Sequence, residues 1–210
     1  ALVSATGSTQ MGKELAPMVS ARLGKLLLEL GGNNAAIVCP SADLDLTIKG
    51  IAFSACGTTG QRCTSLRRLF VHEDIYDDCV KRLQDCFDDL IIGCPSKESS
   101  QIGPLISEES YNNMQEIIDS LKSKGVEVIG GERINIEDPK EFYVKPALVL
   151  VNDIEEEMLK ETFAPILYVK KYIDIKDAIF MQNDVAQGLS SSIFTNDMRE
   201  SELFLSESGS

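Results

Sequence analysis

Residues 34–73, NAAIVCPSADLDLTIKGIAFSACGTTGQRCTSLRRLFVHE, place two short runs rich in apolar residues on either side of a longer segment. In that segment apolar residues recur every three or four positions, which predicts a helix at about 43–57. The flanking runs, 34–38 and 66–73, are predicted strands. A strand, a helix and a second strand in this order indicate an α/β fold with a largely parallel sheet and right-handed crossovers.

The same alternation continues along the chain. Ser41 is predicted to cap helix 43–57, and Asp74 to cap the next helix. Pro17 removes a hydrogen bond from a helix expected within 7–24, so that helix should kink or break there. The other predicted strands are 1–5, 25–30, 125–131, 143–151, 165–173 and 190–195, and the other helices are near 74–91, 107–124 and 174–184.

Composition excludes several classes of protein. The chain has 210 residues, 43% of them hydrophobic, which is enough for one large domain or parts of two. A net charge of -13 argues against a nucleic-acid partner, and Arg67 and Arg68, the densest basic cluster, are explained as strand flanks. No apolar run approaches the roughly 20 residues of a membrane helix.

The opening ALVSATGSTQ has no initiator Met and no leader, so we expect an internal segment of a longer protein.

Cysteine usage indicates the compartment. There are six cysteines without a CxxC pair and a single histidine, so no metal site is predicted. Cys79 and Cys86 share an apolar helical face and are interpreted as core residues. An even count would also suit disulfides in a secreted protein, but reduced thiols in the cytoplasm or the mitochondrial matrix are the preferred interpretation.

Cys63 lies in the turn GTTGQRCT, residues 57–64. Its glycines allow backbone N–H groups to face the sulfur, and the neighbouring Arg62 favours the thiolate, which is the nucleophilic form. The alternative is an inert loop cysteine.

Glu29 ends an apolar strand just before a Gly-Gly turn, in LELGGNN, residues 28–34. Ligands of open α/β sheets bind at this edge. A carboxylate between leucines should be partly desolvated, which suits a general base. Equally, Glu29 could cap the turn or pair with Lys25.

Two further motifs suit a cofactor. In GSTQMG, residues 7–12, a strand turns into a helix whose N-terminus and Ser8 hydroxyl suit a pyrophosphate, while small residues permit close approach. In ETFAPILY, residues 161–168, Glu161 could bind ribose hydroxyls and Phe163 could pack on a flat ring. Alternatively, these are an ordinary helix start, a surface acid and a core phenylalanine.

Taken together, GSTxxG, ELGG, GQxC and ExFxP in this order resemble the aldehyde dehydrogenase superfamily, over essentially the whole chain. The resemblance implies that Cys63 attacks an aldehyde, that a hydride passes to NAD or NADP, and that Glu29 activates the water that hydrolyses the thioester. It further implies a cofactor site whose residues are Gly7, Ser8, Gly12, Leu30, Glu161 and Phe163.

Several segments of the chain are similar to the antiquitin branch of this superfamily, the α-aminoadipic semialdehyde dehydrogenases of lysine degradation. These segments are LLELGGNN, GQRCT, RRLF, ETFAPILY and QGLSSSIFT. Arg62 beside the nucleophile suits a small aldehyde that carries a carboxylate, since guanidinium groups pair well with carboxylates. The alternative is that Arg62 forms a salt bridge with a neighbouring loop.

The resemblance also implies the domain organisation. Residues 1–31 would be the C-terminal end of a Rossmann-like NAD-binding domain, and 32–210 a three-layer catalytic domain that is incomplete at its C-terminus. Members of the family form homo-oligomers such as tetramers. Because the adenosine pocket would precede Ala1, we expect the chain by itself to be inactive.

Other functions remain open. A relative could transfer the thioester to coenzyme A or reduce an acyl phosphate, although neither needs the base Glu29. The chain could also be a non-catalytic piece of the fold. A cysteine esterase using His72 is a weaker alternative, because His72 reads as a solvated residue at a strand end.

Overall fold

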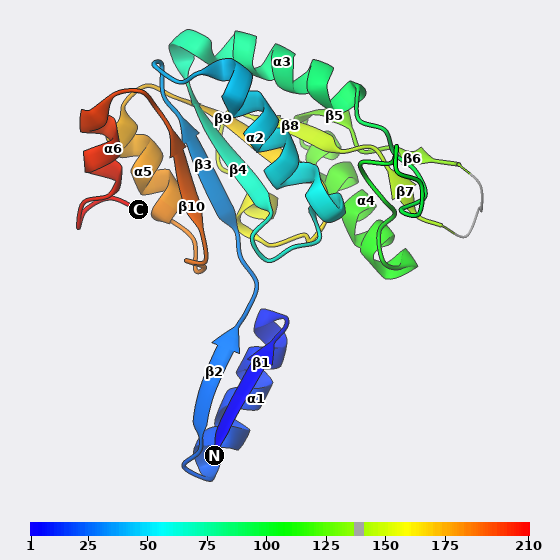
Figure 1. Ribbon diagram of the computed structural model, residues 1–210, viewed down its shortest axis with the longest axis vertical. Helices are drawn as coiled ribbons and strands as arrows, with labels where there is room; N and C mark the ends of the chain where they lie inside the picture. The colour runs from blue at the N-terminus through cyan, green and yellow to red at the C-terminus, as the bar shows by residue number, and fades with distance from the viewer. Residues whose placement is uncertain (137–140) are drawn as a thin grey trace.

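A computed structural model describes residues 1–136 and 141–210. Its body is a six-stranded sheet in the order β10-β3-β4-β9-β8-β5 (Figure 1). All neighbours are parallel except β5, which runs antiparallel to β8. The strands are β3 (Asn34–Val38), β4 (Leu66–His72), β5 (Glu127–Gly130), β8 (Ala147–Val151), β9 (Ile166–Tyr172) and β10 (Ser191–Phe194).

Helices cover both faces of this sheet. One face packs against α2 (Leu44–Cys56) and α3 (Tyr76–Asp88), and its core includes Ile51, Leu69 and Leu83. The other face packs against α4 (Glu108–Ser123), α5 (Ile175–Asn183) and α6 (Met198–Phe204), with Met114, Phe70, Ile179 and Phe204 in its core. All five residues of β3 are buried, as expected for a parallel strand covered on both sides. The predicted three-layer α/β fold is confirmed.

The N-terminal residues form a separate small unit. Here β1 (Leu2–Thr6) pairs in parallel with β2 (Lys25–Glu29), and α1 (Thr9–Ala21) connects them. Figure 1 shows this unit projecting from the body, to which the segment between β2 and β3 joins it. Gly12 is buried against the side chain of Leu30, so that any larger residue would collide with it. That contact fixes α1 against the end of β2, beside the junction.

Short elements complete the chain. A two-stranded antiparallel sheet consists of β6 (Arg133–Ile134) and β7 (Tyr143–Val144). Three 3₁₀ helices are η1 (Gly57–Gly60), η2 (Glu73–Ile75) and η3 (Glu156–Leu159). Sequence periodicity predicts neither β6 nor the 3₁₀ helices, and it also misses α6, which is only seven residues long. The predicted strand 143–151 is divided into β7 and β8, because Pro146 between them lacks the N–H that a continuous ladder needs.

Two predictions about helix ends are wrong. Asp43, not Ser41, caps α2, since its carboxylate accepts from the amides of Asp45 and Leu46. The Ser41 hydroxyl instead accepts from the amide of Asn196. Asp74 caps no helix; it lies inside η2, where the Nδ1 atom of His72 accepts from the Asp74 amide. At Pro17 the break that was one of the two expected outcomes does not occur, since α1 continues through it, and a kink there stays a prediction.

Candidate active site

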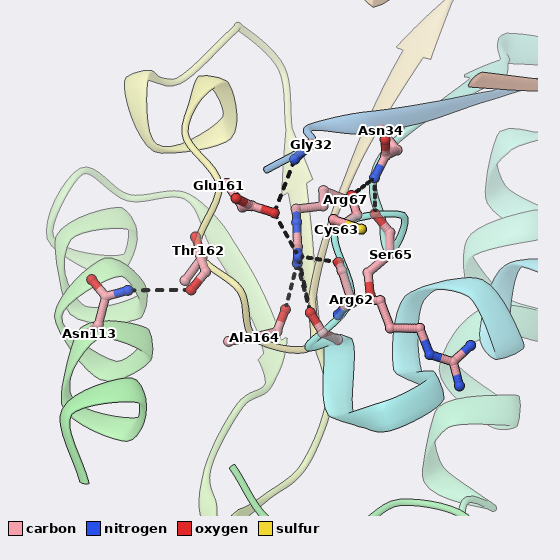
Figure 2. Close-up of polar contacts among 11 residues, drawn as sticks. Gly32, Asn34, Arg62, Cys63, Ser65, Arg67, Asn113, Glu161, Thr162 and Ala164 are labelled. Carbon is pink, nitrogen blue, oxygen red and sulfur yellow. Dashed lines mark hydrogen bonds and ion pairs between the residues drawn. The ribbon is translucent and has the colours of Figure 1, made fainter. Parts of the chain in front are cut away.

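Three segments far apart in the sequence meet beside Cys63: the link after β2, the turn after α2 and the loop before β9 (Figure 2). Glycines permit this approach. A Cβ on Gly32 would collide with the carbonyl oxygen of Cys63, and one on Gly31 with the carboxylate of Glu161. A Cβ on Gly60, whose φ is +65°, would lie 2.5 Å from the carbonyl carbon of Ala164. The Gly-Gly pair in ELGG therefore serves close packing of backbone segments.

The turn that carries Cys63 has an unusual backbone. After α2 ends, Thr58, Thr59 and Gly60 are all left-handed, a region that threonine rarely adopts. The side-chain amide of Asn34 donates to the carbonyl oxygens of Cys63, at 2.7 Å, and of Ser65, at 2.8 Å (Figure 2). The turn is thus held from β3, and Cys63 is left half-buried.

The other cysteines have different surroundings. Cys39, Cys56 and Cys79 are buried, and all six cysteines are free thiols. Burial raises the pKa of Cys39 and of Cys79 to about 12 and also raises the pKa of Cys56. Cys86 is half-buried, and its pKa is raised by burial and by the charge of Asp89. These four thiols therefore stay protonated near neutral pH, as suits core residues.

Glu161 lies opposite the Cys63 turn. Its Oε1 atom accepts from the amide of Gly32 at 3.2 Å and lies 3.5 Å from a guanidinium nitrogen of Arg67 (Figure 2). Two residues further on, Phe163 has a φ of +57° and is 41% exposed. A left-handed phenylalanine with an exposed ring is strained locally, and such residues concentrate at ligand sites.

Arg67 is the site residue that the sequence interpretation missed. It is 2% exposed and lies within β4, so it is a core residue and not the strand flank that was expected. Burial lowers its pKa, and the nearby carboxylate of Glu161 opposes that shift. A signal was present: an arginine inside an apolar parallel strand needs a buried partner, although the sequence does not say which acid supplies it.

Arg68 is buried equally but belongs to another region. Its guanidinium donates to the backbone carbonyls of Asn33, Met181 and Gln182, which joins β4 to α5. Burial lowers its pKa to about 10. Its contacts are therefore structural and lie outside the Cys63 turn.

A cleft of about 1360 Å³ opens over these segments. It brings together seven of the nine residues that were predicted for the site: Gly7, Ser8, Leu30, Arg62, Cys63, Glu161 and Phe163. The opposite wall comes from α4, with Glu109, Asn113 and Glu116 among its residues. The Asn113 amide donates to the carbonyl of Thr162 at 3.4 Å, so α4 supports the Glu161 loop. Ser8 lies at the N-terminus of α1, where its hydroxyl accepts from the amide of Met11.

The two remaining predicted residues do not line the cleft. Gly12 packs under Leu30, as described above. Glu29 is exposed, because side chains alternate along β2 and the half-buried side belongs to Leu28. The expected desolvation of Glu29 is therefore wrong. Its backbone still lies at the cleft edge, since its carbonyl accepts from the amide of Gly7 at 3.0 Å.

Arg62 is exposed and turned away from the sulfur (Figure 2). Its Nε donates to the hydroxyl of Thr58 at 2.7 Å, and its guanidinium lies 5.7 Å from the centre of the Phe53 ring. Within the described residues no carboxylate pairs with Arg62, so the alternative of a salt bridge to a neighbouring loop is not what is observed.

His72 is not part of the cleft. It caps η2 and packs edge-on against Tyr172, with ring centres 5.3 Å apart. In residues 1–136 and 141–210 no group of three or more His, Cys, Asp or Glu side chains is arranged to hold a metal. Nor does any helix in the described part have the length and apolar character needed to cross a bilayer.

Comparison with known proteins gives a consistent result. The model of the aldehyde dehydrogenase family matches residues 1–208. The α-aminoadipic semialdehyde dehydrogenase of Rattus norvegicus is 44% identical over the whole chain, which spans 39% of that protein. A putative aldehyde dehydrogenase family 7 member A1 homolog of Dictyostelium discoideum is 40% identical over the whole chain, which spans 41% of it.

Among solved structures, betaine aldehyde dehydrogenase of Staphylococcus aureus in complex with NAD+ superposes with a TM-score of 0.90. It is 26% identical, and the match covers 96% of this chain and 40% of that one. The chain therefore spans about two fifths of the length of these relatives.

Proposed function

Because the chain belongs to the aldehyde dehydrogenase family, we propose that the full-length protein oxidises an aldehyde to the carboxylic acid, with Cys63 as nucleophile and a nicotinamide cofactor as oxidant. One observation carries the proposal: a half-buried thiol, a carboxylate and an exposed aromatic ring, from segments about 100 residues apart, line one cleft. Such convergence of polar groups in a large cleft is typical of an active site.

The cleft fits the nicotinamide half of a dinucleotide. The first turn of α1 offers amides and Ser8 to a pyrophosphate, and Gly7 leaves room for it. Glu161 is 18% exposed and could accept from ribose hydroxyls, while Phe163 offers a face to a flat ring. When bound, such a cofactor supplies the hydride acceptor. We take it to be NAD, as in the Staphylococcus aureus structure, with NADP left open.

Cys63 would act as the covalent catalyst. Its thiolate sulfur forms a bond to the aldehyde carbon, the carbonyl oxygen becomes an alkoxide, and loss of hydride from that carbon leaves a thioester. A backbone N–H of the glycine-rich turn would stabilise the oxyanion. Water then hydrolyses the thioester, which releases the acid and restores the thiol.

Glu29 is proposed as the general base for that hydrolysis. Its backbone lies at the cleft edge, but its carboxylate points to solvent and would have to rotate towards the thioester. Leu30 directly follows Glu29, and the next two residues, Gly31 and Gly32, add no side chain to the cleft edge. Only hydrolysis of the thioester needs a general base. The presence of Glu29 therefore favours release of the free acid over transfer of the acyl group to coenzyme A or reduction of an acyl phosphate.

For the substrate we propose a small semialdehyde with a distal carboxylate, such as α-aminoadipic semialdehyde. The relative from Rattus norvegicus carries that name. Arg62 lines the cleft without an acidic partner in the described part of the chain, so its guanidinium is available to a carboxylate. We also propose that residues 1–31 are the end of the cofactor domain and 32–210 part of the catalytic domain, since the chain passes between the two units there.

The test uses the full-length protein with NAD+ and either α-aminoadipic semialdehyde or a simple aliphatic aldehyde. NADH is followed by absorbance, and the product is identified by mass spectrometry with and without coenzyme A. We expect the free acid in both conditions. Cys63→Ser should abolish NADH formation, whereas the matched Cys94→Ser should not, because Cys94 lies outside the cleft. Activity in Cys63→Ser, or an acyl-coenzyme A product, would contradict the proposal.

A further inference from the structure

We propose that Arg67 is a positioning residue that joins the Cys63 turn to the Glu161 loop and thereby sets the thiol against the nicotinamide half of the cofactor. The inference rests on the proposed function, which supplies the cofactor. It concerns a residue that does not line the cleft, so it adds a requirement beyond the nucleophile, the base and the direct cofactor ligands.

Arg67 bonds to both segments at once (Figure 2). On the side of the turn, its guanidinium donates to the carbonyl of Gly60 at 3.1 Å and to that of Arg62 at 3.0 Å. On the side of the loop, it donates to the carbonyl of Ala164 at 3.3 Å and lies 3.5 Å from Glu161 Oε1. One rigid planar group therefore spans the two backbones that flank the cleft.

The shape of the guanidinium is essential to this arrangement. A lysine ammonium would restore the charge but is a single point on a flexible stem, and it cannot hold separated carbonyls in one plane. Because Arg67 is buried, every contact it makes also offsets the cost of removing its charge from water. The two segments are thus held in one relative position.

Arg67 also prepares Glu161 for a ligand. The Gly32 amide and Arg67 both meet the same carboxylate oxygen, Oε1. Among the described residues no hydrogen bond uses Oε2, so that oxygen is left for a hydroxyl group. Without Arg67 the carboxylate would keep a single neutral donor and could rotate.

Phe163 is held by the same group. The Arg67 guanidinium lies 5.6 Å from the centre of the Phe163 ring, within the range of a cation–π contact. A left-handed phenylalanine is strained and persists only where neighbours enforce it. Arg67 contacts the ring of that strained residue and bonds to the carbonyl of Ala164 after it, while the Asn113 amide donates to the carbonyl of Thr162 before it, so Arg67 is one of the groups that enforce the strained position.

The test compares Arg67→Lys with Arg68→Lys in the full-length protein. Arg68 is a matched control because it is equally buried in the same strand, and its hydrogen bonds within the described part of the chain go to the carbonyls of Asn33, Met181 and Gln182. Both variants should lose thermal stability. Only Arg67→Lys should weaken NAD+ binding, by about 10- to 100-fold, as expected for a lost charge-assisted contact.

A second measurement reports on the coupling itself, without turnover. NAD+ should slow alkylation of Cys63 by iodoacetamide in the wild-type protein and in Arg68→Lys. In Arg67→Lys a 10- to 100-fold higher NAD+ concentration should be needed to slow the alkylation equally. The KM for the aldehyde at saturating NAD+ should change less than the Kd for NAD+. If Arg67→Lys does not fold, Arg67→Gln keeps amide donors without the buried charge and is used in its place.

The outcomes separate the two proposals. Equal NAD+ affinity and equal protection of Cys63 in the Arg67 and Arg68 variants would overturn this inference alone, since a purely structural role affects only stability. A wild-type protein that binds no NAD+ would overturn the proposed function and this inference with it.

Discussion

The side-chain amide of Asn34 donates to the carbonyl oxygen of Cys63 at 2.7 Å, across 29 positions of sequence. A second bond from the same nitrogen reaches the carbonyl of Ser65. Asn34 is 5% exposed; its bond to Ser65 is buried and its bond to Cys63 is partly buried. The first residue of β3 thus supports the turn that carries the candidate nucleophile, and it does so without contact to the sulfur itself.

We predict that Asn34→Ala lowers the free energy of unfolding by about 2 kcal/mol, because one buried and one partly buried carbonyl lose their donor. The turn should also move, so Cys63 should react with an aldehyde more slowly at saturating substrate. Denaturant unfolding and the burst rate of NADH formation measure the two effects.

Asn33→Ala is the matched control. Asn33 is buried next to Asn34, but its amide donates to the carbonyl of Met158, away from the turn. It should therefore lose comparable stability and keep the burst rate. An unchanged burst rate in Asn34→Ala would show that the turn holds its shape without this amide.

Among the cysteines, Cys63 should react first with limiting iodoacetamide at pH 8. Raised pKa values keep Cys39, Cys56, Cys79 and Cys86 as thiols at that pH, and thiols are poor nucleophiles. Since a raised pKa moves titration to higher pH, these four should label appreciably only under strongly alkaline conditions or after unfolding. Peptide mass spectrometry identifies the site, and first labelling at Cys39 or Cys94 would contradict the prediction.

Much of the fold follows from sequence periodicity. The runs NAAIV and LRRLFVHE, and the helical period between them, predict β3, β4 and α2 to within a few residues. Apolar side chains mark those elements, because a parallel strand is buried on both faces, although β4 also buries Arg67 and Arg68. The short α6 and the 3₁₀ turns lack enough residues to show a period, so they are not predicted.

The site is only partly readable from sequence. Local motifs indicate Cys63, Glu161 and Phe163, and the structure brings them to one cleft. Asn34 and Arg67 act on segments 29 to 97 positions away, and nothing local in the sequence specifies those partners. The orientation of Glu29 was mispredicted for a related reason: two flanking leucines do not bury a side chain that alternates to the open face of β2.

Glu29→Gln should leave the burst of NADH intact and slow the steady state by about 10²–10⁴-fold, since only thioester hydrolysis needs the base. Rapid mixing followed by denaturation and mass spectrometry should detect the accumulated acyl-enzyme on Cys63. Glu14→Gln is the control, because Glu14 is an exposed acid on α1 that bonds only to Gln10. Loss of the burst without acyl-enzyme would assign Glu29 an earlier role.

Arg62→Ala should raise the KM for α-aminoadipic semialdehyde about 10- to 100-fold and leave the KM for an uncharged aliphatic aldehyde nearly unchanged. The reason is the loss of a charge-assisted contact to the distal carboxylate, worth about 1.5–3 kcal/mol. Thr58→Ala is the matched control, since it removes the hydroxyl that holds the Arg62 Nε but keeps the guanidinium. It should leave the ratio of the two KM values as in the wild type. If Arg62→Ala raised the KM for both aldehydes equally, and Thr58→Ala did the same, the contact of Arg62 with Phe53 would only stabilise the turn.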